Sequence, residues 1–231
     1  MYDLYKILNR GIFAVNKIKY FTSAEVVEQL KETIRRVVGV GEGCQLLARF
    51  LHGNKKYVVT GCLGSETTTY NETGIHVNSA PYDHISKESL EEALMSFRGK
   101  ILQTPPKYSA LKMGGRRIAD LTRSGINVEM KPRHVMCYNV KCTDFNPPFF
   151  KLALSCGPGF YVRSLVHDLG LALKSYAYVT ELRRIQHGPF TEDDMLEPEK
   201  WTIEDIVCAI QQASEKYAEF LQNLKNGAMA S

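Results

Sequence analysis

The sequence predicts an α+β fold, in which strands and helices follow one another without a regular βαβ repeat. Segments rich in β-branched and aromatic residues, bounded by glycine and proline, predict the strands. Segments with apolar residues every three or four positions predict the helices. At 231 residues, with 44% hydrophobic and 23% charged residues, the chain can build a core as one large domain or two small ones.

The first part of the chain holds two expected strands and two expected helices. Residues 11–15 (GIFAV) form a short apolar run after a glycine, which is typical of a strand. The segment from Thr22 to Glu25 has the form of a capping box, and helical spacing after it predicts a helix that runs through Arg36. A short helix is expected over 44–53, a strand over 56–63 and a polar loop over 65–74.

The remaining elements follow the same signals. Ser86 is expected to open a helix that continues to Phe97 and is closed by Gly99, and a second helix begins at about Val162. Proline and glycine mark a loop over 102–115. The other expected elements are helices over 116–125 and 203–213, two strands paired around an Asn-Pro-Pro turn over 133–144 and 149–156, and a strand over 178–186.

Composition excludes several classes of function. The absence of any run of 18 or more apolar residues argues against a membrane span, and the N-terminus lacks a signal-peptide layout. The six cysteines contain no CxxC pair, so we expect no zinc site, no disulfides, and an intracellular protein with reduced thiols. The GVGEG segment at 39–43 lacks the full GxGxxG pattern, and no metal or cofactor is expected.

The distribution of charge is more informative than the net charge of +4. From Arg98 to Arg133 the chain carries nine basic residues and two acidic ones. From Thr191 to Glu219 the balance reverses to nine acidic residues and two lysines. A basic middle segment is compatible with a solvated face and with a surface for a polyanion such as RNA, and both interpretations stay open at this point.

Arg163 stands at the start of an apolar helix, directly after GPGFYV. Its side chain can point inward at the helix start or be solvated, and spacing alone favours the solvated interpretation. Only a comparison of several motifs along the chain favours an inward-pointing Arg163.

Five blocks together resemble the TruB family of pseudouridine synthases, in its eukaryotic branch. They stand in the family's order and cover most of the chain from Gly11 to Ile206. The blocks are GIFAVNKIKYFTS (11–23), GNKKYVVTGCLG (53–64), TPPKYSALKMGGRRIADLTRSG (104–125), CGPGFYVRSLVHDLG (156–170) and ELRRIQHGPF (181–190).

The resemblance implies a fold and an activity. We expect the pseudouridine synthase fold, with a mixed, mainly antiparallel sheet flanked by helices and a central RNA-binding cleft, as a single catalytic domain over 1–231. The implied activity is isomerisation of uridine to pseudouridine in a stem-loop such as the T arm of tRNA, with mRNA as a further target. No C-terminal RNA-binding domain is expected after the resemblance ends, and the protein is expected to be a monomer with no membrane partner.

The resemblance also assigns roles to residues. Tyr57 is expected to stack on the flipped base, although a tyrosine in KYVV is by itself typical of a packed strand. Arg163 is expected to pair with the catalytic aspartate, and Leu182 to pack beside the target base or in the strand core. The residues expected to contact RNA are Lys17, Lys107, Tyr108, Lys112, Arg116 and Arg117.

The chain departs from the family pattern at several positions. Ile18 stands where the family usually has proline, Tyr20 where it often has glycine, and Thr68 and Asn71 where aspartate is common. The largest departure is between Arg36 and Val37, where the family's loop of the form GHGGTLDPxAxG has no counterpart. That loop carries the aspartate nucleophile.

Three origins of this gap stay open. The first is that the sequence omits the loop and its numbering continues across the omission. The others are excision by engineering or alternative splicing, and natural loss in a pseudoenzyme. In each case the chain as it stands is expected to be inactive, because a nucleophilic step requires a nucleophile. The alternative is a non-catalytic RNA-binding or RNA-folding protein that uses the same cleft.

Overall fold

The computed structural model describes residues 12–16, 35–39, 44–45, 47, 53–197, 200 and 202–228. The chain divides into two compact units, one formed by Met1–Gly53 with Gln186–Ser231 and the other by Asn54–Ile185. Each unit is described by itself below. The expectation of a single catalytic domain without a C-terminal RNA-binding domain stays a prediction.

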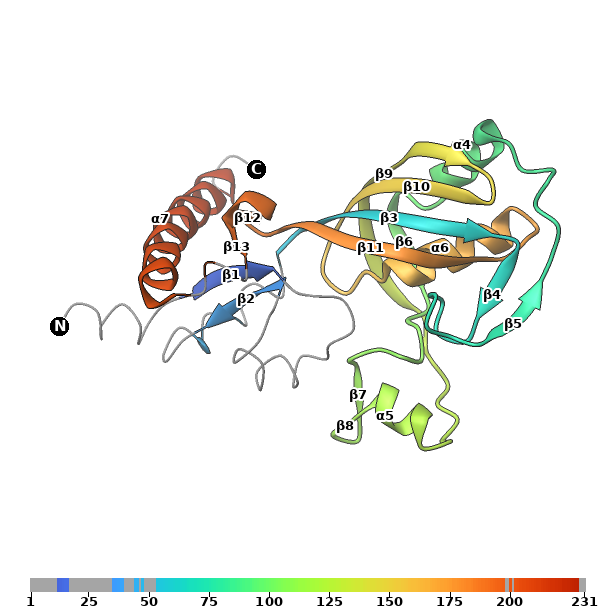
Figure 1. Ribbon diagram of the computed structural model, residues 1–231, viewed down its shortest axis with the longest axis horizontal. Helices are drawn as coiled ribbons and strands as arrows, with labels where there is room; N and C mark the ends of the chain where they lie inside the picture. The colour runs from blue at the N-terminus through green and yellow to red at the C-terminus, as the bar shows by residue number, and fades with distance from the viewer. Residues whose placement is uncertain are drawn as a thin grey trace. The chain divides into compact units, whose positions relative to one another are not determined.

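A six-stranded, mainly antiparallel sheet dominates the fold (Figure 1), with the order β12-β11-β3-β10-β9-β6. This arrangement confirms the α+β class. The strands expected over 56–63, 133–144, 149–156 and 178–186 are all present. The strands are β3 (Lys55–Leu63), β6 (Gly99–Gln103), β9 (Arg133–Asn146), β10 (Phe149–Cys156), β11 (Ala177–His187) and β12 (Phe190–Thr191).

Alternation along β10 places one side of this strand in the core. Phe150, Leu152, Leu154 and Cys156 are buried, whereas Phe149 between them and the turn is 47% exposed. This period of two is that of a strand with one face packed. The pairing of β10 with β9 contains two register shifts, and such irregularities bend the strands locally.

Two helices pack with this sheet in the core of the Asn54–Ile185 unit. They are α4 (Lys87–Met95) and α6 (Val162–Ala172). Ser86 caps α4 in a capping box with Ser89, as its position in the sequence predicted. The largest fully buried side chains of this core include Val59, Leu90, Leu94, Phe150, Leu152, Leu165 and Leu169.

Two segments of the same unit differ from the sequence expectation. The polar segment 65–74 is not all loop, because Ser65–Thr67 forms β4 and pairs with β5 (His76–Ser79). Arg116–Arg117 forms β8 and pairs with β7 (Lys112–Met113), so the helix expected from residue 116 begins later, as α5 (Ile118–Arg123). Cross-strand pairing overrides local propensity at both places.

The other unit contains a three-stranded sheet with the order β13-β1-β2. The strands are β1 (Ile12–Asn16), β2 (Arg35–Gly39) and β13 (Met195–Leu196), and η2 (Glu192–Asp194) and α7 (Ile203–Ala228) complete the described elements. Ile12, Phe190, Ala213 and Tyr217 form its core. No helix of the described residues is long and apolar enough to cross a membrane.

The strand β2 passes directly through the position where the family loop is expected. Arg36 pairs with Val15 and Val37 pairs with Ala14, in an antiparallel register without a shift. The expected helix through Arg36 is therefore wrong at Arg35 and Arg36, which lie in a strand. The earlier part of that helix, and most of the short helix over 44–53, lie outside the described residues.

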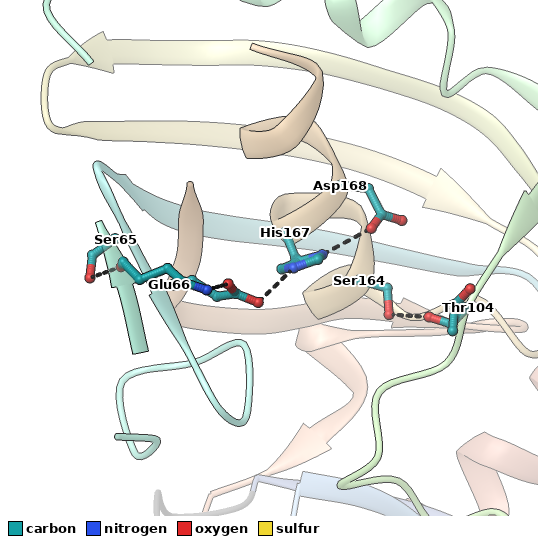
Figure 2. Close-up of polar contacts among 7 residues, drawn as sticks. Ser65, Glu66, Thr104, Ser164, His167 and Asp168 are labelled. Carbon is teal, nitrogen blue, oxygen red and sulfur yellow. Dashed lines mark hydrogen bonds and ion pairs between the residues drawn. The ribbon is translucent and has the colours of Figure 1, made fainter. Parts of the chain in front are cut away.

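A partly buried histidine, His167, joins β4 to α6 (Figure 2). His167 Nε2 lies 2.9 Å from Glu66 Oε1, and His167 Nδ1 lies 3.0 Å from Asp168 Oδ1. The His167 side chain is only 12% exposed, and the Tyr70 ring stacks on it at 3.9 Å between centroids. Burial lowers the pKa of His167, but the hydrogen bonds and charges of Asp168 and Glu66 outweigh burial and raise the net pKa above its usual value.

The raised pKa of His167 predicts a stability that depends on pH. Protonation of His167 favours the folded state fully below the unfolded pKa of about 6.5, and this contribution is lost as pH rises through the higher folded pKa. In urea titrations, the free energy of unfolding should fall from pH 6 to pH 8 more steeply in the native chain than in His167→Gln. At pH 6, His167→Gln should cost about 1.5–3 kcal/mol, the range for a hydrogen bond to a charged group. Parallel pH profiles of the two chains would contradict this assignment.

Gly170 in α6 allows the helix to approach the start of β11 closely. A Cβ at Gly170 would lie 2.6 Å from Tyr176 C and closer still to Ala177 N, both of them backbone atoms that cannot move aside. Alanine usually stabilises a helix by about 1 kcal/mol relative to glycine, but here Gly170→Ala should destabilise by about 1–3 kcal/mol. Leu171→Ala, at a side chain 48% exposed, is the control and should change stability by about 0.5 kcal/mol or less. Thermal unfolding compares the two, and an unchanged Tm for Gly170→Ala would refute the packing argument.

Candidate active site and RNA-facing surface

Arg163 lies in the first turn of α6 and connects two loops. Its Nη1 donates to the Thr69 carbonyl at 3.0 Å, and its Nη2 donates to the Tyr108 carbonyl at 2.8 Å. Burial lowers the pKa of Arg163, although a guanidinium with so high an intrinsic pKa stays charged. Among the described residues, no carboxylate forms an ion pair with Arg163. The side chain is therefore partly buried and directed inward, and the solvated interpretation is wrong.

Further hydrogen bonds fix the segment after β6 to the start of α6. The Gln103 side chain donates to the Tyr161 carbonyl at 3.0 Å and accepts from the Tyr161 N–H at 2.8 Å. Ser164 Oγ donates to the Thr104 carbonyl at 2.7 Å, as Figure 2 shows. Gln103 and Ser164 are buried, so these bonds are shielded from water. The segment from 103 to 108 is thus held at both ends by the first turn of α6.

Tyr57 lies on β3, which pairs with β10 and neighbours β11 in the sheet. Its ring packs partly against the core, and the positive charge of Arg184 on β11 lies near it. Burial raises the pKa of Tyr57, and the nearby Arg184 charge opposes this only in part. Tyr57 is therefore a neutral phenol at pH 7. Sequence reasoning missed Arg184, although it stands two residues from Leu182 in the same ELRR segment and on the same side of a strand.

Leu182 and Lys17 are the two other residues predicted for the site, and only Leu182 is among the described residues. Leu182 on β11 is 43% exposed, so the interpretation as plain strand core is wrong and an apolar surface is available for contact. Lys17 lies outside the described residues. The roles of Tyr57, Arg163 and Leu182 in catalysis stay predictions.

The remaining predicted RNA-binding residues lie on or near one hairpin. Lys112 pairs with Arg117, and Met113 with Arg116, across a two-residue turn. Both turn residues, Gly114 and Gly115, have positive φ, which a type I′ hairpin turn requires and glycine adopts at low cost. The strands β7 and β8 are exposed along their length. This arrangement places three cationic side chains on one short, solvated hairpin.

Lys107 and Tyr108 lie at the loop that Arg163 holds. Lys107 is exposed, and its Nζ donates to Asn127 Oδ1 at 3.0 Å. Tyr108 contributes its carbonyl to Arg163. Tyr108 therefore contacts Arg163 through its backbone, and Lys107 is the residue before it in the same loop.

A pocket of about 300 Å³ opens beside this loop. It is lined by Tyr70, Thr104, Pro105, Lys107, Asn127, Val128, Glu129 and Met130. Tyr70 has φ of 58°, in the left-handed region that is a genuine outlier for so bulky a residue. Burial raises the pKa of Tyr70, and the nearby Glu66 and Asp168 charges raise it further. Sequence reasoning missed this pocket, because TTTYNETG read as a polar loop.

The described residues contain no cluster of three or more histidine, cysteine or acidic side chains that could hold a metal ion. Buried Cys137 and Cys156 lie opposite each other on β9 and β10, and burial raises their pKa values to about 11 and about 12. Both are therefore neutral thiols at pH 7 and poor nucleophiles.

Comparison with protein families identifies two matching segments. Residues 37–162 match the TruB family pseudouridylate synthase N-terminal domain. Residues 163–225 match the tRNA pseudouridylate synthase B C-terminal domain. The first match begins at Val37, directly after the position where the family loop is expected.

Two curated relatives and two solved structures illustrate the similarity. The chain is 40% identical to pseudouridylate synthase TRUB1 of Homo sapiens, over 90% of this chain and 69% of that protein. It is 32% identical to tRNA pseudouridine synthase B of Geobacter sulfurreducens, over 82% of this chain and 68% of that protein. Among structures, a Cbf5-Nop10-Gar1 complex matches with a TM-score of 0.62 at 22% identity, covering 85% of this chain and 55% of that chain.

The archaeal box H/ACA sRNP Nop10-Cbf5 complex matches with a TM-score of 0.62 at 19% identity, covering 89% of this chain and 60% of that chain. At these identities the structures show the fold alone, and the chain spans little more than half of their length. The relatives and the family matches go further, because they share sequence as well as fold over most of the chain. The chain therefore belongs to the TruB family of pseudouridylate synthases.

Proposed function

We propose that this chain, as a monomer inside the cell, binds a folded RNA stem-loop resembling the T arm of tRNA and holds one uridine against Tyr57 and Arg163. We further propose that the chain as it stands does not isomerise that uridine. The observation that carries this second step is the environment of Arg163, whose described partners are two backbone carbonyls and no carboxylate.

The reaction of the family sets the requirements on the residues. Pseudouridine formation breaks the bond between ribose C1′ and uracil N1 and forms a bond between C1′ and uracil C5. The hydrogen on C5 leaves as a proton and N1 ends with a proton, so no oxidant or cofactor is consumed. The base must first leave the stack, which costs a few kcal/mol.

Two of the proposed residues suit the handling of an extruded base. A neutral Tyr57 offers a flat ring on which a base can stack, an interaction of about 1–3 kcal/mol. Leu182 presents an exposed apolar side chain. Neither side chain can attack C1′ as a carboxylate does.

Arg163 is built to orient an acidic group. Two of its five N–H donors are used by the carbonyls of Thr69 and Tyr108, and these neutral acceptors leave its charge uncompensated among the described residues. A carboxylate brought next to it would gain a charge-assisted, bidentate pair and stay ionised. The GHGGTLD-type loop that the chain lacks would supply that group.

A second candidate function, RNA binding without catalysis, is supported by the exposed cationic residues. The exposed hairpin β7–β8 and Lys107 provide cationic contacts that do not depend on a nucleophile. An RNA-binding or RNA-folding protein without chemistry would use this surface unchanged. The two functions differ only in what happens to the uridine after binding.

The catalytic step can be restored or tested directly. The chain as it stands should release no tritium from RNA carrying 5-tritiated uridine, because it has no carboxylate to attack C1′. A chain with a GHGGTLD-type loop inserted between Arg36 and Val37 should release tritium, and the same insertion with asparagine in place of its aspartate should not. Tritium release by the uninserted chain would overturn the proposal of an inactive chain and direct the search to another acidic residue.

The hairpin predicts a salt-dependent contact with RNA. Arg116→Glu with Arg117→Glu should weaken binding of a T-arm stem-loop about tenfold or more at low salt and reduce the slope of log K against log salt by about 1 per lost phosphate contact. The matched control is Lys141→Glu with Lys151→Glu, which changes the charge equally at exposed positions of β9 and β10. Filter binding at several salt concentrations measures both. Equal weakening by the two pairs would show a diffuse charge effect and no hairpin contact.

A further inference from the structure

The strand β6 forms one edge of the six-stranded sheet. It pairs with β9, and among the described residues no strand pairs with its other side. Lys100 is exposed along this strand, and the Leu102 side chain is 61% exposed. The strand is five residues long and contains no proline. Such an edge presents backbone N–H and C=O groups with which a further strand can pair.

The register of the sheet determines which backbone groups of β6 point outward. Met136 on β9 is the partner of Lys100, and the Met136 carbonyl accepts from the N–H of Gly157, just after β10, at 2.9 Å. The N–H and C=O of one strand residue point to the same side, so the polar groups of Met136 face β10 and its pair with Lys100 is a non-hydrogen-bonded one. The N–H and C=O of Lys100 therefore point away from β9. Two residues on, those of Leu102 do the same, whereas those of Ile101 face β9.

The side chains of Lys100 and Leu102 share one face of the sheet, opposite to Ile101, which packs against the core. Only basic charge flanks this edge, because residues 98–107 and 131–138 contain five lysines and arginines, one histidine and no acidic residue. They are Arg98, Lys100, Lys107, Lys131, Arg133 and His134. The edge is therefore electrostatically complementary to an acidic strand.

We propose that β6 is the docking edge for an extended acidic segment of a partner protein, which adds a strand to the sheet beside Lys100 and Leu102. The two N–H groups donate to the added strand, and the two carbonyls accept from it. A carboxylate of the partner opposite Lys100 and a β-branched side chain against Leu102 complete the contact. RNA fits this edge less well, because its phosphates accept from N–H groups but have no donor for the two carbonyls. The proposal does not depend on the proposed RNA binding at the hairpin β7–β8.

Amide hydrogen exchange tests the edge in the native chain. The Lys100 and Leu102 N–H groups should exchange with solvent fast and the Ile101 N–H slowly, because only Ile101 donates to β9. The probe is a peptide in which threonine alternates with glutamate and valine, so that its acidic and apolar side chains share one face. At saturation, this peptide should slow the exchange of Lys100 and Leu102 about tenfold or more. Slow exchange of all three amides in the free chain, or no protection by the peptide, would overturn the proposal.

Binding of the fluorescein-labelled peptide, measured by anisotropy, separates backbone pairing from charge. Leu102→Pro removes an outward N–H without loss of a sheet hydrogen bond, as edge strands allow, and should weaken binding about tenfold or more. Leu102→Ala keeps that N–H and should weaken binding about threefold or less. N-methylation of the glutamate and valine residues of the peptide should abolish binding to the native chain, which tests the same hydrogen bonds even where Leu102→Pro does not fold. Equal binding of the methylated and unmethylated peptides would refute strand addition.

The charge of Lys100 provides a matched pair of variants. Lys100→Glu should weaken peptide binding about two- to fivefold at low salt, whereas Lys151→Glu, with the same change of charge at an exposed residue of β10, should not. A folded Leu102→Pro chain should bind a T-arm stem-loop as the native chain does. Loss of stem-loop binding in that variant, or competition of the stem-loop with the peptide, would assign the edge to RNA and overturn the proposal. Failure of the native chain to bind the stem-loop would overturn the proposed function alone.

Discussion

The pair of hydrogen bonds from Arg163 to the Thr69 and Tyr108 carbonyls is the interaction on which the candidate site depends. It joins two loops that are far apart in sequence to the first turn of one helix. Both loops contribute to the lining of the pocket, one with Tyr70 and the other with Lys107. Because an arginine presents its donors in a rigid planar fork, it fixes the relative position of two carbonyls more tightly than a lysine could. Arg163 on α6 thus holds the two loops that line the pocket.

That arrangement requires a partly buried cation at Arg163, whose charge is stabilised by two carbonyl dipoles and by no carboxylate of the described residues. A buried charge without a counter-ion costs several kcal/mol, whereas carbonyl acceptors recover part of this through charged hydrogen bonds. A few residues along the same helix, His167 shows the opposite solution, with two carboxylates around one imidazole. One face of α6 therefore carries one under-compensated and one fully compensated basic group. The under-compensated one is where an acidic group from elsewhere would bind most strongly.

The elements that were predicted correctly are those whose sequence carries a strong local signal. The β9–β10 pair, the start of α6 at Val162 and the Ser86 cap follow from alternation, helical spacing and capping chemistry, and all three are present. The hairpins β4–β5 and β7–β8 were missed, because their strands are only two to four residues long, mostly polar, and defined by cross-strand pairing more than by an apolar pattern. Tyr70 could not be predicted from its neighbours, since its carbonyl accepts from Val179 and its ring stacks on His167, both about a hundred residues further along the chain. The exposure of the Leu182 side chain could not be predicted either, because an apolar residue in a strand is usually buried in the core.

Binding and chemistry place separate demands on this fold. The stack of Tyr70 on His167, the cationic hairpin and the neutral ring of Tyr57 are held by hydrogen bonds and packing within residues 54–185, and none of them needs a carboxylate at Arg163. The costs of the left-handed turn at Tyr70 and of the partly buried Arg163 are offset by hydrogen bonds of the loops that line the pocket. In the proposed function, a chain without the nucleophile therefore keeps the residues that contact RNA. Under the same proposal, the absence of the family loop removes the step that breaks the C1′–N1 bond, whereas RNA binding does not depend on that loop.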